Sequence, residues 1–95
     1  MSVVISAAVA ALSAKIAEGF DGSAKFVIEG EGGIIVDSDG VRASEEEADV
    51  TLTADADTFQ AMMSGELNPT AAFMSGRLSV DGDMGTAMRL GAALA

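Results

Sequence analysis

The 95-residue sequence predicts an α+β fold, in which a five-stranded, largely antiparallel sheet carries helices on one of its faces. Apolar residues recur at helical spacing near the start and in the second half of the chain, and they alternate with polar residues in between. Glycine-rich and Asp-Gly turns separate the alternating segments, which favours hairpins. The polar sides of the strands agree, so we expect one wet face and one face covered by helices. The length fits a single domain over residues 1–95.

The first expected element is a helix from Ser2 to about Glu18. Alanine, the best helix former, fills most of its positions. Its apolar stripe recurs at helical spacing and consists of Ile5, Val9, Leu12 and Ile16. Gly19 stands where a helix-terminating glycine is expected.

Four strands are expected next, over residues 24–29, 34–36, 41–44 and 49–53. Phe26 and Ile28 point to one face of the first strand, and charged neighbours point to the other. A glycine-rich turn precedes the second strand, and Asp39-Gly40 precedes the third. In the fourth strand Val50 and Leu52 face inward and alternate with threonine.

Helical spacing then returns. Asp55 is a good N-cap for a helix that ends at Gly65, and Asn68-Pro69 begins a shorter helix that ends at Gly76. The buried side of the first of these helices is predicted to hold Phe59, Met62 and Met63.

The last two expected elements are a strand and a helix. Leu78 and Val80 alternate with polar residues, which predicts the fifth strand. Asp83 is expected to cap the final helix. One face of that helix is predicted to consist of Met84, Ala87, Met88, Gly91 and Leu94.

The composition excludes several classes of function. Fifteen acidic and 5 basic residues give a net charge of −10, which argues against binding nucleic acid or an anionic membrane surface. The chain has no histidine and no cysteine, so imidazole or thiolate catalysis, structural zinc sites and disulfides are excluded. No apolar run approaches the length of a membrane span. We expect a cytoplasmic protein that is not an enzyme and has no cofactor and no metal.

Three motifs have simpler structural interpretations. The glycine-rich segment 30–33 lacks the last glycine of a dinucleotide-binding loop and precedes a strand, so we interpret it as a turn. Residues 35–46 place acidic residues at several calcium-loop positions, but Ile35 replaces the first ligand, and an acidic hairpin is the better interpretation. The pairs Asp55/Asp57 and Asp81/Asp83 directly precede helices, where capping explains them.

Methionine is concentrated in the second half of the chain, at Met62, Met63, Met74, Met84 and Met88. Methionine fills irregular cores, and it also lines cavities that accept ligands of variable shape. The composition leaves both interpretations open.

About forty consecutive residues of the second half resemble the sterol-carrier-protein type-2 (sterol-binding domain) family. The order of the segments carries the resemblance: a strand at 49–53, a helix closing in Gly65-Glu66-Leu67-Asn68-Pro69, then residues 72–80 and 81–90. Residues 1–48 match only in plan, as a helix followed by three strands. The aromatic residue common in the family's second strand is replaced by Ile34-Ile35-Val36.

The resemblance implies an apolar tunnel between the sheet and the helices, which binds sterols, fatty acids, fatty acyl-CoA or phospholipids without catalysis. Carried over to this chain, the tunnel wall would comprise Phe59, Met62, Met63, Phe73, Met74, Leu78, Met84, Ala87 and Met88. The sheet would contribute Val50 and Leu52, joined by Phe26 and Ile28.

Two functions follow as hypotheses. The first is a lipid-binding module that sequesters or carries an apolar small molecule, with at most transient membrane contact because the surface is acidic. The second is a protein–protein interaction or dimerisation domain that fills the tunnel with its own methionines, with the last helix docking a partner or a second copy as a homodimer. A connected apolar void beside Met84 and Met88 would distinguish the first from the second.

Overall fold

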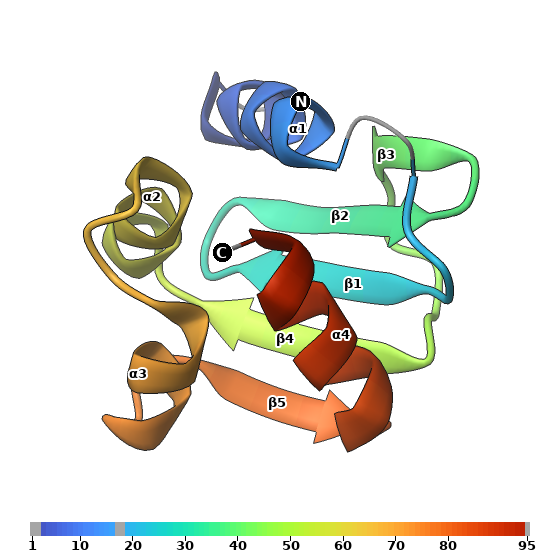
Figure 1. The fold of residues 1–95 in the computed structure, drawn as a ribbon. Helices are drawn as coiled ribbons and strands as arrows, with labels where there is room; N and C mark the ends of the chain where they lie inside the picture. The colour runs from blue at the N-terminus through green and yellow to red at the C-terminus, as the bar shows by residue number, and fades with distance from the viewer. Residues whose placement is uncertain (1–2, 17–18, 95) are drawn as a thin grey trace.

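The helices and strands follow the order that the sequence predicts. The computed structural model describes residues 3–16 and 19–94. Along the chain it contains α1 (Val3–Lys15), β1 (Ala24–Ile28), β2 (Gly32–Asp37), β3 (Gly40–Ala43), β4 (Val50–Ala54), α2 (Ala56–Ser64), α3 (Pro69–Met74), β5 (Ser79–Gly82) and α4 (Met84–Leu94) (Figure 1).

The strands form one five-stranded sheet in the order β3-β2-β1-β4-β5. Hairpin pairing makes β1 antiparallel to β2 and β2 antiparallel to β3, and β4 is antiparallel to β5. The pairing of β1 with β4 is parallel, with Phe26 opposite Leu52. The prediction of a largely antiparallel five-stranded sheet is therefore confirmed.

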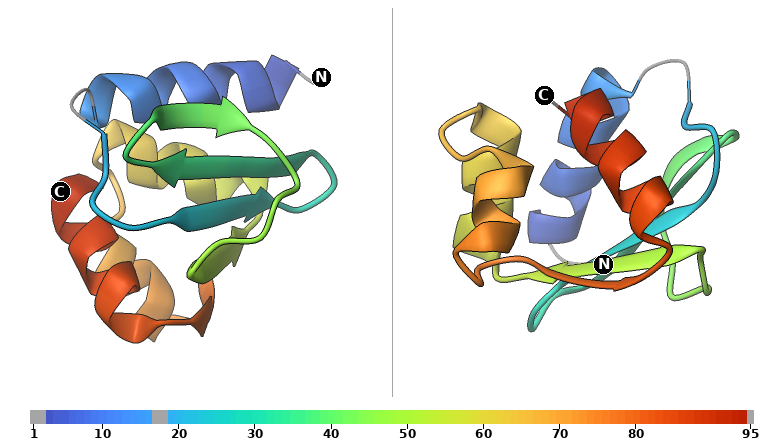
Figure 2. Two further views of the ribbon diagram at one scale, coloured as in Figure 1. Left: turned by 90° about the vertical axis from the view of Figure 1, so that its right-hand side faces the viewer. Right: turned by 60° about the horizontal axis from the view of Figure 1, so that its bottom comes forward.

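The helices of the described residues, α1 to α4, all lie on the same side of the sheet (Figures 1 and 2). Helix α1 packs on β2 and β3, whereas α4 crosses β1, β4 and β5. The strand residues that face the helices are the predicted ones, since Phe26, Ile28, Val50 and Leu52 are all buried. The ring of Phe26 packs edge-on against Phe59 of α2, with 5.5 Å between centroids, which ties α2 to the centre of the sheet.

Side-chain caps fix where the later helices begin. The Asp55 carboxylate accepts a hydrogen bond from the Thr58 backbone N–H (2.7 Å) at the start of α2, and Gly65 ends this helix at φ +85°. The Asp83 carboxylate accepts hydrogen bonds from the Gly85 N–H and the Thr86 hydroxyl at the start of α4. The predicted N-caps are thereby confirmed.

Some boundaries differ from the prediction. Strand β2 begins at Gly32 and not at Ile34. Gly33 lies within the strand because the neighbouring chain packs directly on it: a Cβ atom there would lie 2.8 Å from the Ser44 carbonyl oxygen and from Lys25 Cε. Helix α1 ends at Lys15, and Ile16 forms a turn although the sequence predicts that the helix continues. The rest of the predicted extension, residues 17–18, lies outside the described residues.

The outer face of the sheet is less exposed to solvent than predicted. Ile35 lies on that face, between Lys25 and Arg42 on the adjacent strands, yet it is 2% exposed. The connection from β3 to β4 crosses this side of the sheet (Figure 2), where Lys25 Nζ donates to the Glu45 carbonyl oxygen (3.2 Å). The connection and the long side chains of the two cations cover Ile35.

In α4 the face that carries Met84 and Met88 is not the face that packs into the core. The residues of this helix with almost no exposure are Thr86 and Leu90, whereas Met84 and Met88 are 46% and 73% exposed. The helix is rotated so that its methionines face the gap toward α3 instead of the core. The side chain of Leu94 lies outside the described part of the chain.

Candidate functional site

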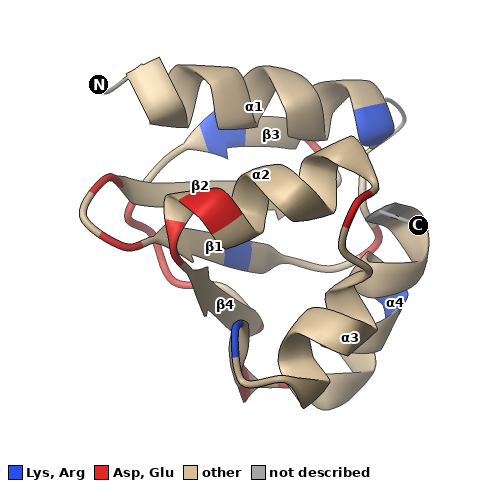
Figure 3. Ribbon diagram, turned by 90° about the vertical axis from the view of Figure 1, so that its left-hand side faces the viewer, with Lys and Arg blue, Asp and Glu red and all other residues tan. Residues whose placement is uncertain are grey.

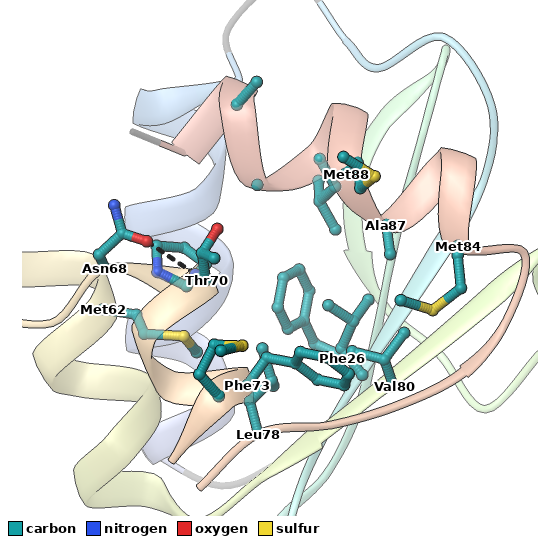
Figure 4. A pocket seen from close by; sticks show the side chains of 16 residues that line it. Phe26, Met62, Asn68, Thr70, Phe73, Leu78, Val80, Met84, Ala87 and Met88 are labelled. Atoms are coloured by element: carbon teal, nitrogen blue, oxygen red, sulfur yellow. Dashed lines mark hydrogen bonds between the residues drawn. The ribbon is translucent and has the colours of Figure 1, made fainter. Parts of the chain in front are cut away.

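A pocket of about 470 Å³ lies between α3, α4 and the sheet (Figure 4). This volume falls within the range of small-molecule sites, roughly 300–1,000 Å³. The residues that line it come from every element around it: Phe26, Leu52, Met62, Asn68, Pro69, Thr70, Phe73, Met74, Leu78, Val80, Met84, Ala87, Met88, Leu90, Gly91 and Ala92.

The sheet supplies the floor of the pocket. Phe26 and Leu52 are cross-strand neighbours on β1 and β4, and Val80 of β5 stands opposite Leu52. Because the side chains of one face point the same way in paired strands, these three form a continuous apolar surface. Leu78, just before β5, extends it toward α3.

The two helices supply the walls. Phe73 and Met74 come from α3, and Met84 and Met88 come from α4. The small residues Ala87 and Gly91 of α4 also line the pocket. An added Cβ at Gly91 would lie 4.0 Å from Cβ of Pro69. The helices therefore come close together beside Gly91.

The pocket is open to solvent and is not an enclosed tunnel. Its rim residues are the most exposed large apolar side chains of α3 and α4, with Met74 at 78% and Met88 at 73% exposure. Phe73 and Met84 are also exposed. The enclosed cavity that the resemblance implies is not shown by this structure, which has instead a pocket whose rim is exposed.

Most of the predicted site residues come together around this pocket. They are Phe26, Leu52, Met62, Phe73, Met74, Leu78, Met84, Ala87 and Met88. The sequence reasoning missed Asn68, Pro69, Thr70, Val80, Leu90, Gly91 and Ala92 as lining residues. Val80 and Gly91 lie on faces that the periodicity identifies, so a signal for these two was present.

Four predicted site residues do not line the pocket. Ile28 and Val50 are buried near the ends of their strands, away from the centre of the floor. Phe59 packs on Phe26 beneath α2, and Met63 packs against the core from the same helix. Helical periodicity marks α2 as apolar, but it does not separate side chains that fill the core from those that face a pocket.

Among the described residues, the only polar side chains in the lining are those of Asn68 and Thr70. Asn68 caps α3, because its Oδ1 accepts a hydrogen bond from the Thr70 N–H (2.7 Å). No carboxylate, lysine or arginine is among the lining residues. The pocket thus provides an apolar surface with one neutral polar end and no general acid or base.

The acidic residues that the sequence singles out have structural roles elsewhere. The hydrogen bond from the Thr58 backbone holds the pKa of Asp55 below its ordinary value, and the Thr86 hydroxyl does the same for Asp83. In the hairpin, Arg42 bridges Asp37 (2.9 Å) and Glu46 (3.1 Å). Over the described residues, no group of acidic side chains is arranged to hold a metal ion.

None of the described helices has the length and apolar character needed to cross a membrane.

Known proteins resemble this chain in sequence and in fold. Residues 5–95 match the profile of the SCP-2 sterol transfer family. Hydroxysteroid dehydrogenase-like protein 2 of Danio rerio is 51% identical over 43 residues, which cover 45% of this chain and 10% of that protein. The matched segment is therefore about a tenth of the length of this curated relative.

Solved structures share the fold over nearly the whole chain. Sterol Carrier Protein 2 Like 2 from Aedes aegypti superposes with a TM-score of 0.77 at 20% identity, covering 93% of this chain and 94% of that one. Sterol Carrier Protein-2 from Aedes aegypti, solved in complex with the C16 fatty acid palmitate, gives a TM-score of 0.77 at 21% identity over 100% and 97% of the two chains. On the family match over residues 5–95, this chain belongs to the SCP-2 sterol transfer family.

Proposed function

We propose that residues 1–95 form a lipid-binding module that holds an apolar chain in the pocket between α3, α4 and the sheet and carries it between other molecules. The pocket itself is the observation that carries this proposal: about 470 Å³ with an almost entirely apolar lining. The family membership and the palmitate complex of the Aedes aegypti protein support it.

The proposed contacts follow from the geometry of the pocket. An acyl chain or a fused-ring ligand would lie on the floor formed by Phe26, Leu52 and Val80. The flexible side chains of Met74 and Met88 would close over it from the two walls. Burying apolar ligand surface releases free energy in proportion to the area removed from water, so chain length and fit would decide affinity.

We propose that this module binds without catalysing a reaction. Its pocket lining holds no titratable side chain, so proton transfer and nucleophilic attack have no candidate group there. The interaction-domain alternative is not favoured, because the methionines leave the space between α3 and α4 open.

Native mass spectrometry of the freshly purified protein, with lipid analysis of the same sample, tests the proposal. We expect a bound species of a few hundred daltons in the mass spectrum. For protein stripped of lipid, we expect the melting temperature to rise on addition of ligands from a panel of long-chain alcohols, sterols and fatty acids. Ligand in excess stabilises the folded state in proportion to the logarithm of its concentration. A bare polypeptide with no thermal shift across the panel would refute lipid binding.

A pocket-filling variant locates the site. Ala87→Trp places a large side chain on the pocket-facing side of α4, and we expect it to abolish ligand binding. Ala43→Trp, at an exposed position on the edge strand β3, is the matched control and should retain binding. Equal binding by both variants would place the ligand elsewhere.

A further inference from the structure

Methionine is the only type of side chain in this protein that a mild oxidant such as hydrogen peroxide readily attacks. The chain has 6 methionines, and it has no cysteine, tryptophan, tyrosine or histidine. Peroxides convert the methionine thioether to a sulfoxide, and reductases restore the thioether. An oxidant that meets the folded protein therefore acts first where methionine sulfur atoms are accessible.

The three most exposed methionines of the described residues all line the pocket. Met74 on α3 is 78% exposed, and on α4 Met88 is 73% and Met84 is 46% exposed. We call these three residues the rim methionines, and Figure 4 shows Met84 and Met88 on the pocket side of α4. In contrast, Met62 is 2% exposed, and Met63 is partly buried against the core. The accessible thioethers are thus gathered around one site.

Oxidation by hydrogen peroxide adds one oxygen atom to each thioether. A sulfur lone pair attacks one peroxide oxygen, so that an S–O bond forms and the O–O bond breaks. The departing hydroxide takes up the proton of the transferred hydroxyl group and leaves as water. Sulfur loses two electrons, and the peroxide gains them. Because hydrogen peroxide is uncharged, the net charge of −10 does not repel it from the pocket.

A sulfoxide on a rim methionine opposes the binding of an apolar chain. Its oxygen is strongly polar, and it loses its hydration when a lipid covers it. Over the described part of the chain, no lysine or arginine is among the lining residues. In Figure 3 the ribbon of α3 carries neither acidic nor basic residues. The pocket therefore has no cationic partner for a sulfoxide beneath a bound lipid.

The same oxidation leaves the fold intact. With the pocket empty, the side chains of Met74 and Met88 are mostly in water, so a sulfoxide there stays hydrated. A sulfoxide at the buried Met62 would instead disrupt the core. The exposure of the rim methionines thus separates an effect on binding from an effect on folding.

We propose, on the basis of the function proposed above, that Met74, Met84 and Met88 form a reversible modification site that controls lipid binding. Hydroperoxides oxidise these thioethers to sulfoxides in the empty pocket, which weakens lipid binding. A dithiol-dependent reductase restores binding, with the sulfoxide oxygen leaving as water and the dithiol becoming a disulfide. Bound lipid protects the site because it covers the sulfur atoms.

Limited treatment of the purified protein with hydrogen peroxide tests the proposal. The dissociation constant of the fluorescent fatty acid dansyl-undecanoic acid is measured before treatment and again after desalting. We expect peptide mass spectrometry to find the rim methionines oxidised about tenfold faster than Met62. The dissociation constant should rise about tenfold, and the circular dichroism spectrum should stay unchanged. Methionine sulfoxide reductases with dithiothreitol should restore the affinity.

The possible failures of this experiment are distinguishable. Three results overturn the modification site while leaving lipid binding intact: equal oxidation rates at the rim and at Met62, an unchanged dissociation constant once the rim is oxidised, and a loss of binding that accompanies unfolding. Untreated protein that binds neither dansyl-undecanoic acid nor palmitate overturns the proposed function itself.

Leucine variants locate the effect. The triple variant Met74→Leu, Met84→Leu and Met88→Leu carries apolar side chains of similar volume that peroxide does not oxidise. Each protein is compared with itself, as the ratio of the dissociation constants after and before treatment. We expect a ratio of about ten for the native chain and below about two for the triple variant.

A matched control removes a methionine that does not line the pocket. Met63→Leu should keep the ratio of about ten. If the triple variant does not fold, Met74→Leu with Met88→Leu changes only the two most exposed positions, and its ratio should fall below about three. A variant that is folded and lacks these thioethers, yet loses as much affinity as the native chain, shows that the rim methionines are not the site.

Protection by a ligand tests the last part of the proposal. With palmitate at a saturating concentration, we expect Met74 and Met88 to be oxidised about fivefold more slowly, while the rate at Met63 changes less than about twofold. Equal rates at Met74 and Met88 with and without palmitate would contradict the covering of the rim by bound lipid.

Discussion

Leu90 is the residue that packs α4 against the core. The sequence does not predict this role, because the methionines of the same helix are equally apolar. It is 0% exposed, while Met88, two positions earlier, is almost free of the core. Both residues are large and apolar, so hydropathy alone gives them the same role. The difference arises because the methionine face of α4 turns toward the pocket and only one narrow side of the helix meets the sheet.

We expect Leu90→Ala to lower the free energy of unfolding by about 2–5 kcal/mol, because it removes a fully buried side chain and leaves a void. Met88→Ala is the control on the same helix, and its effect should stay within about 0.5 kcal/mol. Urea denaturation followed by circular dichroism measures both. An equal loss in the two variants would show that the core contact of α4 has been misassigned.

The helix caps show how single residues set element boundaries, and they give α2 and α4 a defined response to acid. In each case the folded state lowers the pKa of the capping carboxylate, Asp55 or Asp83, from an ordinary value of 3.8. Because the pKa is lower in the folded state than in the unfolded state, each ionised carboxylate contributes its full stabilisation at pH values above 3.8. This stabilisation is lost as the pH falls through the lowered pKa of the folded protein.

We expect Asp83→Asn to destabilise the protein at neutral pH and to have a much smaller effect at acidic pH, below 3.8. Asparagine keeps an oxygen acceptor for Gly85 and Thr86 but lacks the charge that strengthens the bonds. Thermal unfolding of the two proteins over a pH series measures the difference. Asp57→Asn, at an exposed position in α2, is the control, and a constant difference across the pH range would contradict this account of Asp83.

At the scale of elements, the connection from β3 to β4 depends on the strand β2 that it packs against. Gly33 has no space for a side chain beneath Ser44 and Glu45, so the course of the whole connection from β3 to β4 depends on a residue in β2. The Ser44 N–H also donates to the Gly33 carbonyl oxygen (3.1 Å). The connection thereby acts as a cover for the outer face of the sheet.

Gly33→Ala is expected to cost about 1–3 kcal/mol, because the backbone carbonyl of Ser44 cannot move aside without breaking this contact. Gly85→Ala makes the same change in the first turn of α4, where the nearest atom is Asp83 Oδ1 at 3.5 Å. The control is expected to be neutral or to gain up to about 1 kcal/mol, since alanine favours a helix. A tolerated Gly33→Ala would mean that the connection adjusts readily.

The sequence allowed the elements to be predicted better than their mutual placement. Capping residues and alternation located each helix and strand, because these signals are local. The parallel pairing of β1 with β4 and the burial of Ile35 depend on a connection that returns across the sheet, which no local signal encodes. For the same reason Phe59 and Met63 were expected at the site, whereas the orientation of α2 directs them to the core.

For the whole molecule, the two halves of the helical layer have different roles. Helix α1 covers β2 and β3 with a packed core, and α3 and α4 border the pocket over β4 and β5. Ligand binding should therefore stabilise the molecule unevenly, because only the second half gains contacts.

Hydrogen exchange with and without a bound long-chain alcohol tests this expectation. Amides of α3 and α4 should exchange about tenfold or more slowly with ligand, while amides of α1 that open locally should keep their rates. The comparison is made at a ligand concentration that saturates binding. Uniform protection of all amides would show that binding stabilises the fold only as one cooperative unit.

The exposed methionines at the pocket rim also bear on how the protein behaves in concentrated solution. With the pocket empty, Met74, Met84 and Met88 form an apolar area on the surface, and such areas draw molecules together. At neutral pH the mutual repulsion of chains that each carry −10 keeps them apart. Near the isoelectric point of about 4.1 this repulsion vanishes. We therefore expect the empty protein to be least soluble at that pH, and we expect a lipid in the pocket to raise its solubility there by covering the apolar area.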